Sequence, residues 1–208
     1  MPKGTYDDTH AKIIEKGRKM FLDNGYERTN LRDLCAAAGV TTGSFYRHFS
    51  GKEDLFSYLV SPAVDELHML FETSEERCGE LLDALGTEGL WKIMDADAVT
   101  DFIYRHFDRL KLLLKCADGT KYSDFLHDFV CLETEYTWKA FEMAKEKNMI
   151  SEELPSDKEL HMICHAYISG IMEVVAHDFK RSEAEKFIHT IFDFFRHGLT
   201  GILGLQAE

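Results

Sequence analysis

Residues 29–55 read TNLRDLCAAAGVTTGSFYRHFSGKEDL, and this stretch decides the fold. Leu31, Leu34 and Ala38 recur at the spacing of one helix face. Asn30 comes directly before them, and its side-chain oxygen can accept from the free backbone N–H groups at a helix start. The stretch therefore begins with a short capped helix.

A tight turn and a second short helix follow. Gly39 stands where the first helix should end, because glycine adopts the left-handed conformation at little cost. Thr41 or Thr42 can cap the next helix, which we expect to be about two turns long. Phe45 and Phe49 then share one face at i, i+4, and hydrogen-bonding side chains occupy the other face. This division predicts a helix-turn-helix, whose second helix enters the DNA major groove. The alternative is an ordinary helical hairpin with a polar surface.

On these residues the chain resembles the TetR/AcrR family of transcriptional regulators. The preceding residues 13–29, IIEKGRKMFLDNGYERT, are similar to the first helix of that family, with Ile13, Gly17 and Phe21 at core-facing positions. Gly17 departs from the pattern, since a glycine inside a helix costs about 1 kcal/mol relative to alanine. Cys35 stands where alanine is usual.

The resemblance implies a homodimer that binds a double-stranded DNA operator. The residues it assigns to the DNA surface are Thr29, Asn30, Thr41, Thr42, Gly43, Ser44, Tyr46, Arg47, His48 and Lys52. Of these, Ser44 and Arg47 are the candidates for base edges, because arginine pairs well with guanine. Tyr46, His48 and Lys52 are candidates for phosphate contacts, which position a protein on DNA without specifying sequence. For any one of them the alternative is a solvated surface residue.

The charge of the chain is unevenly distributed. The net charge is −13, yet residues 1–52 hold nine Lys and Arg against six Asp and Glu. DNA binding must therefore come from one localised face, and dimerisation would double the phosphate contacts. The chain lacks a secretory signal pattern or an apolar run of about 20 residues, so we expect a cytoplasmic protein without a membrane span.

The hydrophobic pattern predicts an all-α fold of about nine helices. We expect a three-helix DNA-binding domain over residues 1–52 and a helical effector-binding and dimerisation domain over residues 53–208. The expected helices are 8–24, the two of the helix-turn-helix, 52–72 with a kink at Pro62, 99–107, 108–116, 122–147, 157–180 and 182–203. Gly79, Gly86 and Gly89 predict short helices and loops between residues 73 and 98.

The last two expected helices have wide apolar stripes that include small residues, which let another helix approach closely. The expected dimer interface consists of Ala166, Gly170, Val174, Ile191, Phe194, Phe195 and Gly198. TetR-like proteins dimerise through such a four-helix bundle. The alternative is packing within one subunit.

Aromatic residues in the middle of the chain exceed what a small helical core needs, so we expect a pocket for a small apolar or aromatic effector. Its candidate residues are Trp91, Phe102, Phe107, Tyr122, Phe125, Phe129, Tyr136, Met162 and His165. An aromatic stripe at helical spacing is more often core than pocket. Glu133, Glu135 and Glu173 can neutralise a cation if they are buried, although surface acids are far more common.

No cofactor, metal or catalytic motif is expected. His161 and His165 lie at i, i+4 with Cys164 between them, and His127 and Cys131 repeat the spacing. Without a Cys-x-x-Cys pair or an acid in register we expect no metal site. The sequence lacks a nucleophile elbow, a phosphate-binding glycine loop and a metalloprotease helix, so we expect no enzyme.

The sequence therefore predicts a homodimeric regulator, a repressor that a small-molecule effector releases from a palindromic operator. One alternative is a DNA-binding protein of this fold that has no effector and is controlled by a protein partner. Another is an enzyme whose helical domain is catalytic. The effector, the operator and the regulated genes cannot be read from the residues.

Overall fold

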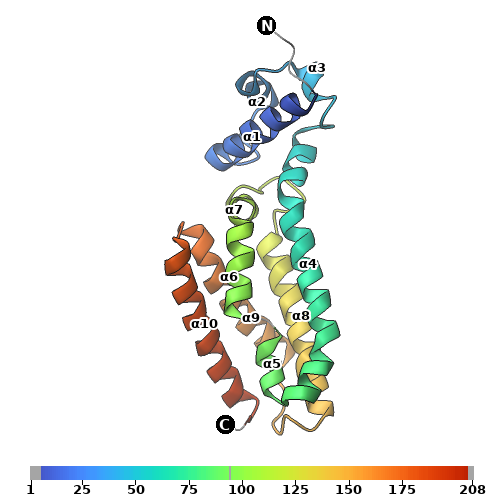
Figure 1. The fold of residues 1–208 in the computed structure, drawn as a ribbon, viewed down its shortest axis with the longest axis vertical. Helices are drawn as coiled ribbons and strands as arrows, with labels where there is room; N and C mark the ends of the chain where they lie inside the picture. Colours follow the sequence, from blue (N-terminus) through green and yellow to red (C-terminus); the bar gives the residue numbers. More distant parts are fainter. Residues whose placement is uncertain (1–5, 94, 206–208) are drawn as a thin grey trace. The chain divides into compact units, whose positions relative to one another are not determined.

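The computed structural model describes residues 6–93 and 95–205, and the regular elements of this part of the chain are all helices (Figure 1). They are α1 (Tyr6–Asn24), α2 (Leu31–Ala38), α3 (Thr42–Phe45), α4 (Lys52–Leu85), α5 (Glu88–Lys92), α6 (Ala96–Arg105), α7 (Phe107–Lys115), α8 (Phe125–Glu146), α9 (Asp157–Ala176) and α10 (Arg181–Ile202). The expected all-α class is confirmed, with ten helices in the described residues where about nine were expected.

The chain divides into two compact units, which differ from the expected domains. Unit 1 contains residues 1–65 and 108–125, and unit 2 contains residues 66–107 and 126–208. The chain therefore crosses between the units three times, within α4, near the start of α7 and at the start of α8. The expected boundary at residue 52, between a DNA-binding domain and an effector-binding and dimerisation domain, stays a prediction.

The core of unit 1 joins α1 to the helix-turn-helix. Ile13 and Phe21 on α1 are fully buried, as the pattern predicted, and Phe21 packs edge-on against Phe56 of α4 with ring centroids 5.3 Å apart. The structure also accounts for Gly17. A Cβ atom there would lie 2.6 Å from Cδ2 of Leu55, so the missing side chain lets α4 approach α1 closely.

Helix α4 corrects the expected end at residue 72. It continues to Leu85 and contains both Pro62 and Gly79. A single glycine costs only about 1 kcal/mol in a helix. Burial of Phe71, Cys78 and Leu82 on one face outweighs that cost, since a fully buried side chain of this size gains roughly 1.5–3 kcal/mol. The helix ends where Gly86 adopts a left-handed φ of 60°.

The other expected helices agree with the structure to within a few residues at their ends. The largest difference is at α9, which ends at Ala176 and not at Lys180. His177 caps this end, and Asp178 follows with a positive φ of 54°, which cannot continue a helix.

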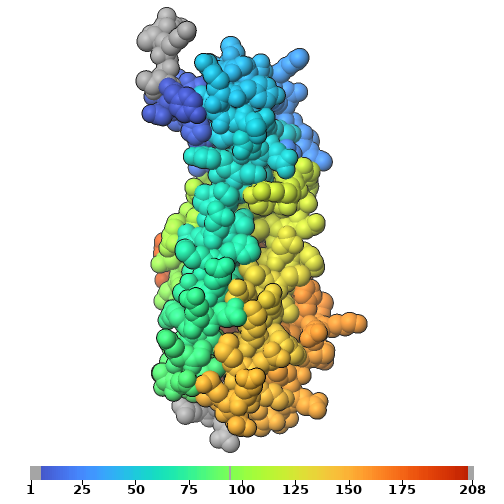
Figure 2. Space-filling view, turned by 90° about the vertical axis from the view of Figure 1, so that its right-hand side faces the viewer, coloured from blue at the N-terminus to red at the C-terminus, as the bar shows by residue number. Residues whose placement is uncertain are grey.

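In unit 2 the later part of α4 lies beside α8, and Figure 2 shows these two helices along one face. Phe71 of α4 packs on Tyr136 of α8 with ring centroids 5.1 Å apart. Lys139 of α8 pairs with Glu75 of α4 at 3.1 Å. Helix α10 packs against α6 and α9. Aromatic side chains thus bring together helices that are far apart in sequence.

Candidate DNA-binding surface and ligand cavity

The turn between α2 and α3 is built by the residues that the sequence singled out. Asn30 caps α2, and its Oδ1 accepts from the Arg32 N–H at 2.8 Å. Gly39 ends α2 with a left-handed φ of 67°, and its N–H donates to the Ala36 carbonyl. Thr41 is the cap of α3, because its Oγ1 accepts from the Ser44 N–H at 3.0 Å.

Helix α3 spans only four residues, but helical hydrogen bonding continues beyond it. The His48 N–H donates to the Phe45 carbonyl at 2.9 Å, and the Phe49 N–H donates to the same carbonyl at 3.1 Å. Phe45 is 0% exposed and Phe49 is 3% exposed. The two rings therefore anchor about two turns of backbone, and the opposite face is left to solvent.

Most of the residues assigned to DNA by resemblance lie on that outer surface. Asn30, Thr41, Thr42, Gly43, Tyr46 and Arg47 are exposed, and Ser44 is half-buried. The Arg47 guanidinium reaches Oγ of Ser44 at 3.4 Å, so the two candidates for base contacts lie together. Their role in DNA binding stays a prediction.

Thr29 is buried, which corrects its assignment to the DNA surface. Its side chain is 2% exposed, and its hydroxyl donates to the carbonyls of Gly25 at 2.7 Å and Met20 at 3.2 Å. The side chain therefore ties the end of α1 to the start of α2 and cannot reach a phosphate. The sequence misled here because threonine serves both purposes.

Lys52 also has a structural role. Its Nζ donates to the Tyr26 carbonyl at 2.7 Å and the Thr29 carbonyl at 3.1 Å, and it lies 4.0 Å from the centroid of the Tyr26 ring. Burial lowers the pKa of this ammonium, and the nearby Glu27 carboxylate raises it. Because its N–H groups donate to these carbonyls, a structural link between α4 and the loop after α1 explains Lys52 better than a contact with phosphate.

We predict that Lys52→Met lowers the free energy of unfolding by about 1–3 kcal/mol, the usual effect of losing charge-assisted hydrogen bonds. Urea unfolding followed by circular dichroism measures this. Lys12→Met, at an exposed position of α1, is the control and should change stability by less than about 0.5 kcal/mol. Equal stability of the two variants would show that the carbonyl contacts contribute nothing.

His48 is half-buried within a group of rings. Its ring centroid lies 4.1 Å from that of Tyr6 and 5.4 Å from that of His10. Burial lowers the pKa of His48, and the neighbouring His10 and Arg47 lower it further. The neutral ring is therefore favoured, and packing explains His48 better than the predicted contact with phosphate.

Unit 2 contains a cavity of about 470 Å³, which we call the main cavity. Cavities of roughly 300–1,000 Å³ hold most small-molecule ligands. Its walls come from α4, α5, α6, α8, α9 and α10. Of the expected pocket residues it brings together Trp91 and Tyr136. Phe102 and Phe129 line a neighbouring cavity of about 190 Å³ in the same unit.

The remaining five expected pocket residues do not line either cavity. Met162 is 64% exposed and His165 is also exposed, on the outer face of α9. Phe107 stacks on Tyr104, with ring centroids 5.3 Å apart. Tyr122 and Phe125 belong to unit 1, where the Tyr122 ring lies 6.3 Å from that of Phe56. For Phe107, Tyr122 and Phe125 the cause is that an aromatic at helical spacing packs in the core more often than in a pocket, whereas Met162 and His165 lie on the face of α9 that points away from the cavity.

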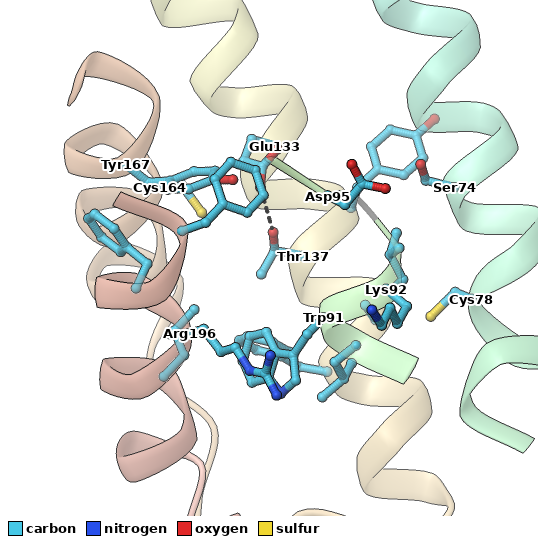
Figure 3. Close-up of a pocket in the computed structure, with 18 of the residues that line it drawn as sticks. Ser74, Cys78, Trp91, Lys92, Asp95, Glu133, Thr137, Cys164, Tyr167 and Arg196 are labelled. Carbon is cyan, nitrogen blue, oxygen red and sulfur yellow. Dashed lines mark hydrogen bonds between the residues drawn. The ribbon is translucent and has the colours of Figure 1, made fainter. Parts of the chain in front are cut away.

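Three polar residues of the main cavity lie together, as Figure 3 shows for Glu133, Cys164 and Tyr167. Glu133 is 9% exposed, and its Oε1 accepts from the Thr137 hydroxyl at 3.3 Å. Its Oε2 is buried without a hydrogen-bond partner. A signal for this site was present in the sequence. Glu133 follows Phe129 by four residues and precedes Ala140 by seven, so it lies on the buried face of α8.

The electrostatics of this group follow from burial. Burial raises the pKa of Glu133 to about 7, against the lowering effect of the Thr137 hydrogen bond. Burial also raises the pKa of the Cys164 thiol to about 12, and the Glu133 charge adds to the effect. The pKa of Tyr167 is raised for the same two reasons, burial first. Near neutral pH the Glu133 carboxyl group is therefore partly protonated.

Because the pKa of Glu133 is higher in the folded protein than the ordinary value of 4.5, the folded state binds more protons than the unfolded chain between these pH values. Stability contributed by this group is complete below about pH 4.5 and is lost as pH rises to about 7. We predict that Glu133→Gln raises the free energy of unfolding by about 3 kcal/mol at pH 8 relative to its effect at pH 4.5, because the amide does not titrate and its own hydrogen bonds contribute equally at both pH values. Urea unfolding at both pH values measures this, with Glu142→Gln at an exposed position of α8 as the control. A Glu133→Gln effect that is the same at both values would mean that the acid is not buried.

The outer faces of α9 and α10 expose apolar side chains. Phe194 is 71% exposed and Ile202 is 48% exposed, and Ala166 and Gly198 are exposed beside them. Of the other expected interface residues, Gly170, Ile191 and Phe195 are half-buried, and Phe195 also lines the main cavity. Val174 is 0% exposed, so its assignment to the interface is wrong. It lies inside its own unit.

His127 and His161, one from each pair considered as metal ligands, lie side by side with ring centroids 6.0 Å apart. Sγ of Cys131 lies 3.6 Å from Nε2 of His127 on the same helix. Within residues 6–93 and 95–205, no group of three or more His, Cys, Asp or Glu side chains has the geometry to hold a metal ion. In the same residues, no helix combines the length and the apolar character needed to cross a membrane.

Comparison with known proteins agrees with this architecture. The family model described as "Bacterial regulatory proteins, tetR family" matches residues 13–59, which cover most of α1, α2, α3 and the start of α4. In these residues the chain is similar to that family.

Among curated proteins, the chain is 31% identical over 104 residues to the uncharacterized HTH-type transcriptional regulator YfiR of Bacillus subtilis, covering 47% of this chain and 50% of that protein. It is 49% identical over 41 residues to the HTH-type transcriptional repressor DhaR of a Mycobacterium species, covering 20% of this chain and 21% of that protein. The chain thus matches at most about half the length of these relatives.

A solved TetR-family regulator from Bordetella parapertussis shares the fold over most of both chains. It covers 96% of this chain and 98% of its own, with a TM-score of 0.59 and 19% identity. The family model thus matches the helix-turn-helix segment, while the likeness of helical layout extends along the chain.

Proposed function

We propose that the protein is a homodimeric DNA-binding regulator, a repressor whose α3 reads one half of a palindromic operator. The observation that carries this proposal is the outer face of α3, where Arg47 and Ser44 lie together over a backbone anchored by Phe45 and Phe49. Relatives that match part of the chain are named as transcriptional regulators and, for DhaR, as a repressor.

Dimerisation is supported by the apolar stripe on α9 and α10. A side chain such as Phe194, 71% exposed in the single chain, gains roughly 1.5–3 kcal/mol when a partner covers it. A two-fold dimer places two recognition helices on two half-sites. It also doubles the number of phosphate contacts, which matters because residues 1–52 are only weakly basic.

Control by an effector is supported by the main cavity. Two of the helices that line it, α4 and α8, also cross into unit 1. The chain also crosses between the units near the start of α7. A ligand that shifts these helices can bias the DNA-binding unit. By linkage, effector and operator then weaken the binding of each other by the same factor, typically about 5–150-fold.

The second candidate function is a DNA-binding protein of this fold that has no small-molecule effector and is controlled by a protein partner. A filled core in unit 2 would favour it, and a cavity of about 470 Å³ favours an effector.

We predict that Arg47→Ala costs about 1–3 kcal/mol of binding to the preferred DNA sequence and relaxes the choice of base at one position of each half-site. Fluorescence anisotropy on a set of single-base variants of that sequence measures both effects. Arg77→Ala is the matched control, because it removes the same charge from an exposed position of unit 2. Equal losses on every sequence would make Arg47 a phosphate contact, and no loss would remove it from the interface.

A further inference from the structure

Glu133 is a carboxyl group for which the fold supplies an incomplete set of partners. It lies on α8 at the wall of the main cavity, 9% exposed, with one oxygen bonded to Thr137 and Oε2 buried without a partner. An unpaired buried polar atom is costly. Because the Glu133 side chain lines a cavity of ligand size, its carboxyl group marks a place where a ligand's donor group is expected.

The walls around Glu133 are apolar and aromatic. Tyr167 lies beside it, with its ring edge-on to Phe192 at 5.4 Å and to Phe195 at 5.2 Å. Tyr136 and Trp91 add further rings to the lining. Aromatic faces attract organic cations and also pack on apolar rings. The lining therefore fits a ligand with an apolar body and a positive centre.

Charged groups at the cavity come from each helix packed around it. Those that can titrate or carry charge are Glu75 and Cys78 of α4, Lys92 of α5, Asp95 before α6, Asp97 of α6, Lys139 of α8, Cys164 and Tyr167 of α9, and His189, Asp193 and Arg196 of α10. Two of the cations are already paired with carboxylates other than Glu133. Lys139 lies 3.1 Å from Glu75, and Arg196 makes two bonds to Glu88 at 2.8 and 2.9 Å. His189 pairs with Asp97 at 2.9 Å.

Resting on the effector-controlled function proposed above, we propose that the main cavity takes an organic monocation: an apolar, ring-containing molecule with one protonated amine whose N–H donates to the Glu133 carboxylate. Burial holds part of Glu133 in the neutral form near pH 7, so binding of the cation displaces a proton from it. Affinity therefore rises with pH through this range for as long as the ligand amine stays protonated.

Matched amine and alcohol probes test the ligand class without DNA. The pairs are benzylamine and benzyl alcohol, 2-naphthylmethylamine and 2-naphthylmethanol, and 9-anthracenylmethylamine and 9-anthracenylmethanol. Titration calorimetry of the full chain at pH 8 should show at least one amine binding tenfold or more tightly than its alcohol. At pH 7 its binding enthalpy should vary with the ionisation enthalpy of the buffer, because a proton is released.

Glu133→Gln should weaken that amine tenfold or more and change the alcohol less than twofold. Glu142→Gln, which removes the same charge from an exposed position of α8, should leave both unchanged. Circular dichroism checks the fold of each variant, and Thr137→Val, which removes the hydrogen bond and keeps the carboxylate, should keep the preference for the amine. The proposal is overturned if no amine binds better than its alcohol, or if Glu133→Gln binds the amine as the native chain does. A bound amine that leaves DNA affinity unchanged would instead contradict induction and leave the ligand class intact.

Discussion

The substitution Gly198→Arg is expected to turn the dimer into a monomer and to weaken operator binding about 10²–10⁴-fold, the gain that two linked contacts normally give. Gly198 is exposed on α10, and a Cβ atom there would have no heavy atom within 4 Å. An arginine therefore fits the single chain without strain. It would place a charge beside Phe194 and Ile202 in the proposed interface, where an unpaired buried charge is costly.

Sedimentation equilibrium measures the oligomeric state, and fluorescence anisotropy measures the affinity for operator DNA. Glu185→Arg is the control, because Glu185 is exposed on α10 nine residues before Phe194, on the opposite side of the helix. That variant should remain a dimer. Dimers of Gly198→Arg with native affinity would place the interface elsewhere.

The second large effect is expected at Phe45. Phe45→Ala removes a fully buried ring from the base of α3, and such a change costs about 3–5 kcal/mol. The four residues of α3 cannot hold a helix by themselves, since isolated helices shorter than about 12 residues are marginal in water. Sequence-specific DNA binding should be lost along with the stability of unit 1. Urea unfolding and anisotropy measure the two losses.

Tyr46→Ala provides the comparison at the next position. Tyr46 is 57% exposed, so its removal should change stability by less than about 0.5 kcal/mol while weakening DNA binding. Similar stability losses in the two variants would contradict the division of α3 into a buried and an outer face.

The helix-turn-helix could be predicted because its signals are local. A capping side chain, a left-handed glycine and an i, i+4 aromatic pair act over a few residues, so Asn30, Gly39, Thr41, Phe45 and Phe49 have the expected places. Side chains whose partners come from elsewhere in the chain are harder to predict. Lys52 looks like a DNA contact in sequence, and only the folded chain brings it to the carbonyls of Tyr26 and Thr29.

The residues that line the main cavity are predicted less well than those of the helix-turn-helix. Trp91 and Tyr136 line the main cavity, but an aromatic residue does not show from sequence whether it lines a space or fills it. Glu133 was noted as one of three acids, and burial separates it from the other two, which are exposed. The sequence predicts too short a helix α4. Gly79 suggests the end of a helix, but its cost in helix stability is smaller than the stabilisation from the side chains buried around it.

The central claim is that two copies of α3 read a palindromic DNA sequence. Selection from random double-stranded DNA by the native chain at about 150 mM salt tests it most directly, since specific binding must there exceed the salt-sensitive attraction to phosphate. We predict enrichment of two inverted half-sites with centres about 34–36 Å apart, one helical turn, and a weaker base preference when the selection is repeated with Arg47→Ala. A selected pool with no enriched sequence, or with a single asymmetric site that Arg47→Ala selects equally well, would contradict it.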